Sequence, residues 1–314
     1  MGDYKIKQYK KMKIIHSLQS RLDYYCHKIA KTHKYLLGQK VLAFLQTSPP
    51  DYISKEEKDI IIEFLKHHLI GVFNYPFAKE YTKKIKFTKD RKNGLYYMIT
   101  KEGHRMYMKR GLSKRRMQKT CAFLEVEQHQ QSPHNYCFEP LAISSDTVIA
   151  DIGSAEGNFG LKFIDKIKKL YLFEVEPEWI EALEATFEPW KDKVVIVNRF
   201  VGNKDDAQTV KLDTFFNTIK PTLLKIDVEG AEKDVFAGAE RLIRDGIADV
   251  LCCTYHRHGD DVAFTKYMED KNYKVTHSQK FMLHISEYSG WGTRMKSPID
   301  FRRGLIHATP KEHT

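Results

Sequence analysis

The sequence predicts an α/β protein with a doubly wound, Rossmann-like sheet of seven strands, behind a mostly helical N-terminal region that contains one β-hairpin. From Asp146 onward, short apolar runs alternate with helical segments, which is the pattern of parallel strands joined by crossover helices. The balance of basic and acidic residues changes before Asp146. Residues 1–120 hold 28 Lys and Arg against 10 Asp and Glu, a net charge of +18, and the rest of the chain has −7. We therefore predict a basic cap of residues 1–126 and an α/β domain of residues 127–314.

The cap is predicted to be helical from its periodicity. Apolar residues recur at spacings of three, four and seven between residues 15 and 36, which predicts a long amphipathic helix, and Pro49 ends it. The apolar stripe of such a helix packs on its own domain or forms a seam between two copies, so a homo-oligomer is one outcome. Ser54 and Glu57 have the capping-box spacing and predict a second helix that continues through residue 73.

The later elements are predicted from composition and alternation. Two β-rich runs predict a hairpin over residues 94–111, and residues 113–131 return to helical character. Seven strands are predicted at residues 147–153, 170–177, 193–198, 222–230, 248–255, 273–279 and 302–308. In doubly wound sheets, ligands bind at the carboxyl ends of the strands, beside the point where the strand order reverses. We therefore expect functional side chains at these strand ends.

The composition narrows the class of protein. No run of about eighteen apolar residues is present, so stable membrane insertion is not predicted, and the lysine-rich N-terminus lacks the apolar segment of a secretory signal. Five cysteines without CxxC spacing predict reduced thiols in a cytoplasmic protein, without a structural zinc site. The basic half implies an anionic partner, such as a nucleic acid, a phosphorylated glycan, a nucleotide-sugar or the inner face of a membrane, unless it is only a solvated surface.

The ends of the first two strands predict a nucleoside site. The loop "DIGSAEGNFG" supplies Asp151, Gly153 and Gly157, and glycines allow a sharp turn and the close approach of a ligand. Glu174 follows the second strand at a distance suited to an acid that binds a ribose diol. Asp151 would repel a pyrophosphate but suits a cationic cofactor such as S-adenosylmethionine. The pattern therefore favours methyl transfer over hydride transfer. The sequence contains no GxxxxGK[ST] motif, so a P-loop phosphotransferase is not predicted.

The fourth strand end carries a row of charges. Alternation places Lys225, Asp227 and Glu229 on one side of the extended segment "LLKIDVEGAE". These residues either face a cleft or form salt bridges at a strand–helix junction. We interpret Asp227 as functional and Glu232 as an acid in the first turn of a helix, which the helix dipole favours.

Two further segments bring polar side chains to the same edge. His256 and His258 follow the fifth strand, where an imidazole acts as a general base or, with Asp227, binds a divalent cation; the alternative is an exposed polar loop. His134 and Tyr136 belong to a polar segment just before the α/β domain. That segment is either a loop folded over a site or an interdomain linker.

With these residues in place, the chain resembles the FkbM-type S-adenosylmethionine-dependent methyltransferases. The most specific match is "LLKIDVEGAEKDVFAGA" at Leu223–Ala239, and the resemblance covers roughly residues 127–309. It implies a methyltransferase fold whose last strand is antiparallel, and O-methylation of sugar hydroxyls. The sequence "EVEP" departs from the family pattern, so the ribose acid is Glu174 or Glu176, and the strand register favours Glu174. The cofactor-binding residues that the resemblance implies are Asp151, Gly153, Glu156, Gly157, Asn158, Glu174, Val175, Arg199 and Phe200.

We therefore predict a cytoplasmic, S-adenosylmethionine-dependent O-methyltransferase that acts on a saccharide or another anionic glycoconjugate. The predicted catalytic residues are Asp227, His256 and His258, and the predicted substrate-binding residues are His134, Tyr136, Lys225 and Glu229. A divalent cation held by Asp227 and His256 is an additional hypothesis. Two alternatives stay open: a nucleic-acid methyltransferase that uses the basic N-terminal region, and a non-catalytic scaffold that binds the cofactor or a membrane surface.

Overall fold

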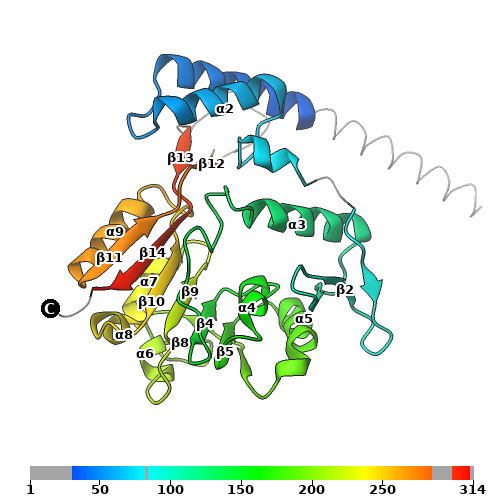
Figure 1. Ribbon diagram of the computed structural model, residues 1–314, viewed down its shortest axis with the longest axis vertical. Helices are drawn as coiled ribbons and strands as arrows, with labels where there is room; N and C mark the ends of the chain where they lie inside the picture. Colours follow the sequence, from blue (N-terminus) through cyan, green and yellow to red (C-terminus); the bar gives the residue numbers. More distant parts are fainter. Residues whose placement is uncertain (1–29, 82–83, 285–298, 312–314) are drawn as a thin grey trace, which may run out of the picture. The chain divides into compact units, whose positions relative to one another are not determined.

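The computed structural model describes residues 30–81, 84–284 and 299–311 (Figure 1). The described residues belong to two compact units, one within Met1–Pro76 and Ile285–Ile299, and the other within Phe77–His284 and Asp300–Thr314. None of the helices in these described ranges is long and apolar enough to cross a membrane.

The first unit is helical in its described part. One helix covers residues 30–47; the rest of the predicted amphipathic helix lies outside the described residues. Helix α2 (Lys55–His67) is capped by the Ser54 side chain, which accepts the Glu57 N–H. The Glu57 carboxylate accepts from the hydroxyl of Tyr75 at 2.6 Å. The predicted continuation to residue 73 is wrong, because His68 takes an extended conformation and ends the helix.

The second unit begins with a small sheet and a helix. The predicted hairpin is confirmed as β2 (Tyr96–Ile99) and β3 (Arg105–Tyr107), with β1 (Thr88–Lys89) added at its edge. Helix α3 (Lys114–Glu127) follows, and a 3-10 helix η1 (Pro76–Lys79) precedes the sheet. This unit begins at Phe77, whereas the predicted domain boundary lies at residue 126. The segment between them belongs to the unit because it packs on helix α5 (Pro177–Phe187). The Tyr107 N–H donates to Thr186 Oγ1 at 3.0 Å, and Arg110 pairs with Glu181.

All seven predicted strands form one sheet (Figure 1). In sequence order they are β4 (Val148–Ile152), β5 (Lys169–Phe173), β6 (Val194–Val197), β9 (Leu223–Ile226), β10 (Asp249–Cys253), β11 (Tyr273–His277) and β14 (Leu305–Pro310). Their spatial order is β11-β14-β10-β9-β4-β5-β6. Strand β14 is antiparallel to both neighbours, β10 and β11, as the resemblance implied. Two short pairs lie outside this sheet: β7 (Phe200–Val201) with β8 (Thr209–Val210), and β12 (Met282–His284) with β13 (Asp300–Arg302).

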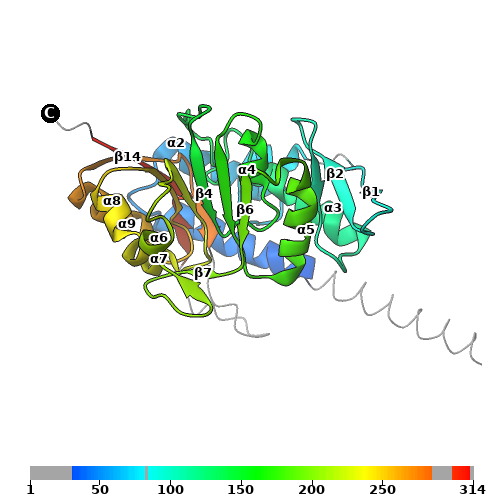
Figure 2. The same ribbon diagram turned by 90° about the horizontal axis from the view of Figure 1, so that it is seen from below.

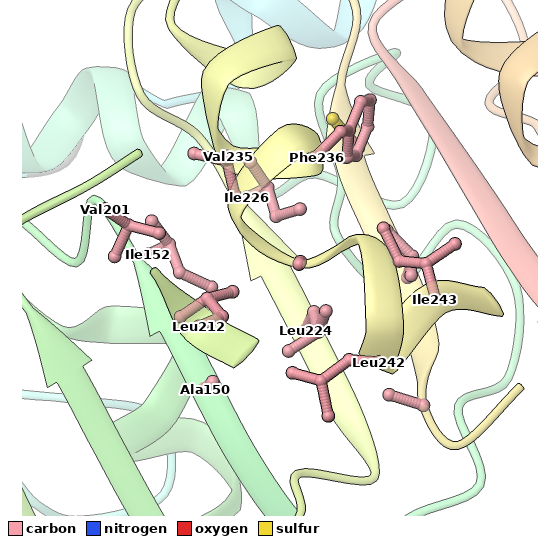
Figure 3. Close-up of a cluster of buried hydrophobic side chains, with 14 of the residues drawn as sticks. Ala150, Ile152, Val201, Leu212, Leu224, Ile226, Val235, Phe236, Leu242 and Ile243 are labelled. Carbon is pink, nitrogen blue, oxygen red and sulfur yellow. The ribbon is translucent and has the colours of Figure 1, made fainter. Parts of the chain in front are cut away.

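Helices cover both faces of the sheet. Helix α4 (Asn158–Phe163) and α5 pack on one face, with the 3-10 helix η2 (Glu188–Trp190) after α5. Helices α6 (Leu212–Phe215), α7 (Glu232–Gly238), α8 (Glu240–Arg244) and α9 (Asp260–Asp270) lie on the other side (Figure 2). The second face is built from alternate strand residues. Figure 3 shows the helix residues Val235 and Phe236 of α7 and Leu242 and Ile243 of α8 packed over the strands. The strand residues beneath them are Ala150 and Ile152 of β4 and Leu224 and Ile226 of β9.

The strand order reverses between β4 and β9. These two parallel strands are neighbours, with Asp151 opposite Lys225 and Ile152 opposite Ile226. Their chains then leave in opposite directions across the sheet, and ligands of doubly wound sheets bind outside the carboxyl ends of the strands at such a switch point. The loops after β4, β9 and β10 all reach this edge.

Candidate active site

Asp227 lies at the centre of the candidate site. It follows β9 directly, and its backbone N–H donates to Ile152 O of β4 at 3.0 Å. Its side chain is 15% exposed. The hydroxyl of Tyr136 donates to Oδ2 at 2.7 Å, the hydroxyl of Tyr255 lies 3.4 Å from Oδ1, and His134 Nε2 lies 3.8 Å from Oδ2. The segment before the sheet therefore folds against the strand-end acid.

His256 lies beside the same carboxylate. Its Nε2 is 3.4 Å from Asp227 Oδ1 and 3.5 Å from Glu229 Oε2. Its Nδ1 is 2.8 Å from Glu232 Oε1. Both ring nitrogens are buried, and neither has a hydrogen bond of good geometry within the described part of the chain. The structure therefore brings together two of the three predicted catalytic residues.

The electrostatics of this cluster are set by burial and by mutual pairing. Burial disfavours the charged form of Asp227, but Lys225 and the neighbouring imidazole and phenol groups outweigh it and hold its pKa below the ordinary value. Burial also lowers the pKa of His256, but Glu232, Asp227 and Glu229 outweigh it and raise this pKa above the ordinary value. Burial lowers the pKa of His134 to about 4. At neutral pH, His134 is therefore neutral, whereas the acids around His256 favour the protonated form of its ring.

Lys225 and Asp151 form a buried ion pair across the switch point. Lys225 Nζ lies 3.0 Å from Asp151 Oδ1 and donates to Gly153 O at 2.7 Å. It also lies 5.2 Å from the centroid of the Tyr136 ring. Burial raises the pKa of Asp151, and Lys225 only partly offsets this. The carboxylate of Asp151 therefore faces Lys225 within the core of the switch point.

Two glycines of the loop after β4 are required by close packing. A Cβ on Gly153 would lie 1.9 Å from the carbonyl oxygen of Asp227, and a Cβ on Gly157 would lie 2.7 Å from Leu183 of α5. Both have positive φ, which glycine adopts without strain. Ala155 and Glu229 also have positive φ, although neither is glycine. Such conformations cluster at functional sites, and both lie at the switch point.

The structure separates the two candidate ribose acids. Glu174 follows β5, and its carboxylate accepts the backbone N–H groups of Ala155, Val175 and Glu176 at 2.7–2.9 Å. A carboxylate has about four lone-pair sites, so Glu174 retains capacity for a ligand hydroxyl. Glu176 instead pairs with Lys109 of the small sheet. The geometry at the strand end therefore favours Glu174, as the register predicted.

The remaining predicted cofactor residues differ in exposure. Asn158 begins α4, directly after Gly157, and burial raises the pKa of Glu156 to about 7. Arg199 is exposed, and Phe200 is 56% exposed at the start of β7. An exposed aromatic ring there offers a flat surface to a ligand base.

His258 is not part of the cluster around Asp227. Its side chain is 81% exposed, and its Nδ1 lies 3.0 Å from Asp300 Oδ1. Asp300 in turn binds Arg302 Nε at 2.6 Å. Arg302 Nη1 donates to the carbonyl oxygens of Tyr255 and His256, each at 2.8 Å. Strand β13 thus fixes the loop that carries His256.

Sequence reasoning missed four contributors to this site. Tyr255 and Cys253 lie among the buried side chains around Asp227. Glu232, interpreted as a plain helix start, is buried against His256. Arg302 comes from a short strand 46 residues further along the chain than His256. Nothing local in the sequence distinguished these four residues from exposed ones.

The residues around Asp227 fit a divalent cation poorly. Among the described residues, one group of metal-binding side chains has its donor atoms within 4.8 Å of one another: His134, Asp227 and Cys253. Burial and the charge of Asp227 raise the pKa of the Cys253 thiol well above its ordinary value, so it does not supply a thiolate. Lys225 places a positive charge beside Asp227. We derive no step through a metal.

Three solved structures illustrate the likeness to known proteins. A methyltransferase FkbM from Methylobacillus flagellatus KT is 16% identical over 60% of this chain and 53% of that chain, with a TM-score of 0.42. A precorrin-6y C5,15-methyltransferase from Geobacter metallireducens GS-15 is 12% identical over 55% of this chain and 84% of that chain, with a TM-score of 0.38. A Streptococcus mutans protein solved in complex with SAH is 12% identical, over 53% of this chain and 89% of that chain, with a TM-score of 0.34.

No curated protein matches the chain. The family model of the methyltransferase FkbM domain matches residues 110–275, which is more than half of the chain. The fold is thus that of a Rossmann-like methyltransferase, and the predicted family resemblance is confirmed. This chain belongs to the FkbM methyltransferase family.

Proposed function

We propose that the chain transfers a methyl group from S-adenosylmethionine to a hydroxyl group of a saccharide. The observation that carries the proposal is the pair of Asp227 and His256, whose Oδ1 and Nε2 atoms lie 3.4 Å apart at the switch point. A carboxylate and an imidazole at this place can orient a hydroxyl group and accept its proton.

The strand-end loops suit the cofactor. Glu174 would accept hydroxyls of the ribose, and the backbone of Gly153 and Gly157 would line the methionine portion. S-adenosylmethionine would supply a methyl group on a positively charged sulfur. The crevice suits a cation, because Asp151, Asp227, Glu229 and other acids surround it. Burial and neighbouring carboxylates raise the pKa of Glu127 to about 8, which fits a site with an excess of negative charge.

His256 is the proposed general base. The acceptor hydroxyl would lie beside both Nε2 of His256 and Oδ1 of Asp227, and its proton would pass to Nε2 as the oxygen attacks the methyl carbon. The ring must first be neutral at Nε2, and a cation bound beside it favours that form. Most of the rate acceleration would come from holding the reacting atoms about 3–3.5 Å apart.

The acceptor's anionic portion has a candidate site of its own. A hollow of about 630 Å³ lies between α3 and the small sheet. Its charged and aromatic lining consists of three lysines, two glutamates and two tyrosines, so the cations outnumber the acids: Lys84, Lys86, Lys101, Glu80, Glu125, Tyr81 and Tyr97. Lysines attract phosphate or carboxylate groups, and tyrosine rings stack on sugars and bases. This supports a phosphorylated or acidic saccharide as acceptor.

The direct test is methyl transfer from isotopically labelled cofactor to a panel of phosphorylated, acidic and neutral saccharides. We expect label in the phosphorylated or acidic members, and loss of the label after His256→Ala, with cofactor affinity retained. Cofactor binding without transfer to any saccharide would contradict the proposed acceptor.

A second candidate acceptor is RNA, because the same lysines and tyrosines suit phosphates and stacked bases. Its signature is a steep fall of RNA affinity with rising salt together with label transfer to RNA. Absence of RNA binding at low salt would remove it. A non-catalytic scaffold is the remaining alternative, and transfer to any acceptor excludes it.

A further inference from the structure

Glu232 is a buried acid at an unusual place. It is the first residue of α7 and is 1% exposed. An acid at an exposed helix start gains only a small stabilisation from the helix dipole, whereas burying an isolated carboxylate costs several times more free energy. The helix dipole therefore does not account for the burial of Glu232, and its hydrogen bonds must.

The carboxylate of Glu232 connects the loop after β9 to the loop after β10. Its Oε1 accepts the N–H groups of Val228 and Gly230 at 3.3 and 3.2 Å. The same oxygen lies 2.8 Å from Nδ1 of His256. Oε2 has no hydrogen-bond partner among the described residues. Two backbone groups thus fix the acid, and the acid presents a fixed negative charge to one edge of the imidazole ring.

We propose that Glu232 is a positioning residue that keeps a proton on Nδ1 of His256, so that only the Nε2 proton is exchanged with the acceptor; this inference rests on the proposed function. A carboxylate accepts hydrogen bonds and donates none. Facing Glu232, the ring is stable with Nδ1–H, both as the neutral imidazole and as the imidazolium. Nε2 then faces the carboxylates of Asp227 and Glu229. The ring takes the hydroxyl proton at Nε2, and Glu232 stabilises the charge that results.

Other groups around the ring do not replace Glu232. Glu229 approaches Nε2 but is 88% exposed, so water screens its charge. The charged and titratable groups that act on the ring from the elements around it are Asp227, Glu229, Glu232, His134, Tyr255, His284 and Arg302. Of these, Glu232 alone is recorded within 3 Å of Nδ1 in the described structure.

The test compares Glu232→Gln, which removes the charge, with Glu232→Met, which removes both the charge and the acceptor. Glu240→Gln is the control, because Glu240 is an exposed acid of α8 that pairs with Lys271. Histidine side chains are labelled with ¹⁵N, and the ring signals of His256 are assigned by their loss in His256→Gln. In the unsubstituted protein and the control, we expect Nδ1 to carry a proton. In Glu232→Met, we expect the Nδ1 signal to move toward the unprotonated position.

The second readout is kinetic. We expect kcat to fall on the order of 10²-fold in Glu232→Met and less in Glu232→Gln, with cofactor affinity unchanged, because a buried acid that fixes a catalytic imidazole acts on the chemical step. An unchanged Nδ1 signal in a folded Glu232→Met protein would overturn the proposal. So would full kcat in that variant. The spectra need no acceptor, so they decide the role of Glu232 even if the saccharide assignment fails.

Discussion

Lys225 and Asp151 form a buried ion pair, 3.0 Å apart, that joins the two central strands at the switch point of the sheet. Both side chains are almost fully buried. Removing one member of such a pair leaves an uncompensated buried charge, which typically costs about 3–5 kcal/mol. We expect Asp151→Ala to lower the free energy of unfolding by about this amount, as measured by chemical denaturation.

The double variant Asp151→Leu/Lys225→Met separates charge from packing. Replacing both members by apolar residues removes the unpaired charge, so we expect this variant to recover most of the stability that Asp151→Ala loses. It should nevertheless bind the cofactor weakly, because Lys225 no longer holds the carbonyl oxygen of Gly153 in the loop after β4. A double variant as unstable as the single one would show that packing, and not charge, dominates at this place.

Gly153→Ala should be far more destabilising than an alanine at another glycine of similar backbone conformation. Both Gly153 and Gly111 have positive φ, 76° and 82°. A Cβ on Gly153 would meet Asp227 O at 1.9 Å, whereas nothing lies within 4 Å of one on Gly111. The backbone strain, about 1–2 kcal/mol, is common to both. Equal melting temperatures for the two variants would contradict the close approach of β4 and β9.

His307 is expected to make stability depend on pH. It lies buried on β14, with Glu139 at Nδ1 and Asp249 at Nε2. Burial lowers its pKa, but the two acids outweigh this and raise the pKa above the ordinary value. A raised folded-state pKa stabilises the protein below the unfolded-state value of about 6.5. That contribution is lost as the pH rises through the folded-state value.

The measurement is the melting temperature of the unsubstituted protein and of His307→Gln between pH 5.5 and pH 8.5. We expect the difference between them to shrink as the pH rises. A difference that stays constant across this range would show that His307 acts through packing alone.

Activity should rise with pH through the pKa of His256. The proposed base must be neutral at Nε2, and Glu232, Asp227 and Glu229 raise its pKa above the ordinary value of about 6.5. The acidic limb of kcat/KM against pH reports this group in the free enzyme. We expect Glu232→Gln to shift that limb to lower pH and Glu240→Gln to leave it in place. An acidic limb that does not move in Glu232→Gln would show that the group titrating in this limb is not His256.

The sheet was predictable because its strands are short apolar runs separated by helices, and its carboxyl edge was predictable because Asp151, Glu174 and Asp227 each follow such a run. The contacts between the loops at this edge could not be predicted. Local sequence does not distinguish a solvated acid at a helix start from a buried one, so the place of Glu232 was missed. The predicted boundary at residue 126 followed the change in charge, whereas the compact unit begins at Phe77. Tyr107, Met117 and Cys121 share an apolar cluster with Trp179 and Ala182 of α5, and a change in net charge does not reveal such packing.

His258 shows the same limit. In the sequence, both His256 and His258 follow the fifth strand as candidate bases, and the prediction favours His256. In the structure, His256 lies against Asp227 and Glu232. His258 is exposed to solvent and pairs with the buried Asp300. The difference depends on Arg302, which comes from β13 and fixes the loop through two carbonyl oxygens. No spacing within the loop predicts a partner so distant in sequence.

The most direct test of the central claim is a single-turnover measurement of methyl transfer in His256→Gln and His258→Gln, with cofactor affinity determined for both. The account predicts that His256→Gln lowers the rate about 10²–10⁴-fold, that His258→Gln retains it, and that both bind the cofactor like the unsubstituted protein. A His256→Gln protein that binds the cofactor and transfers the methyl group at the full rate would contradict the account.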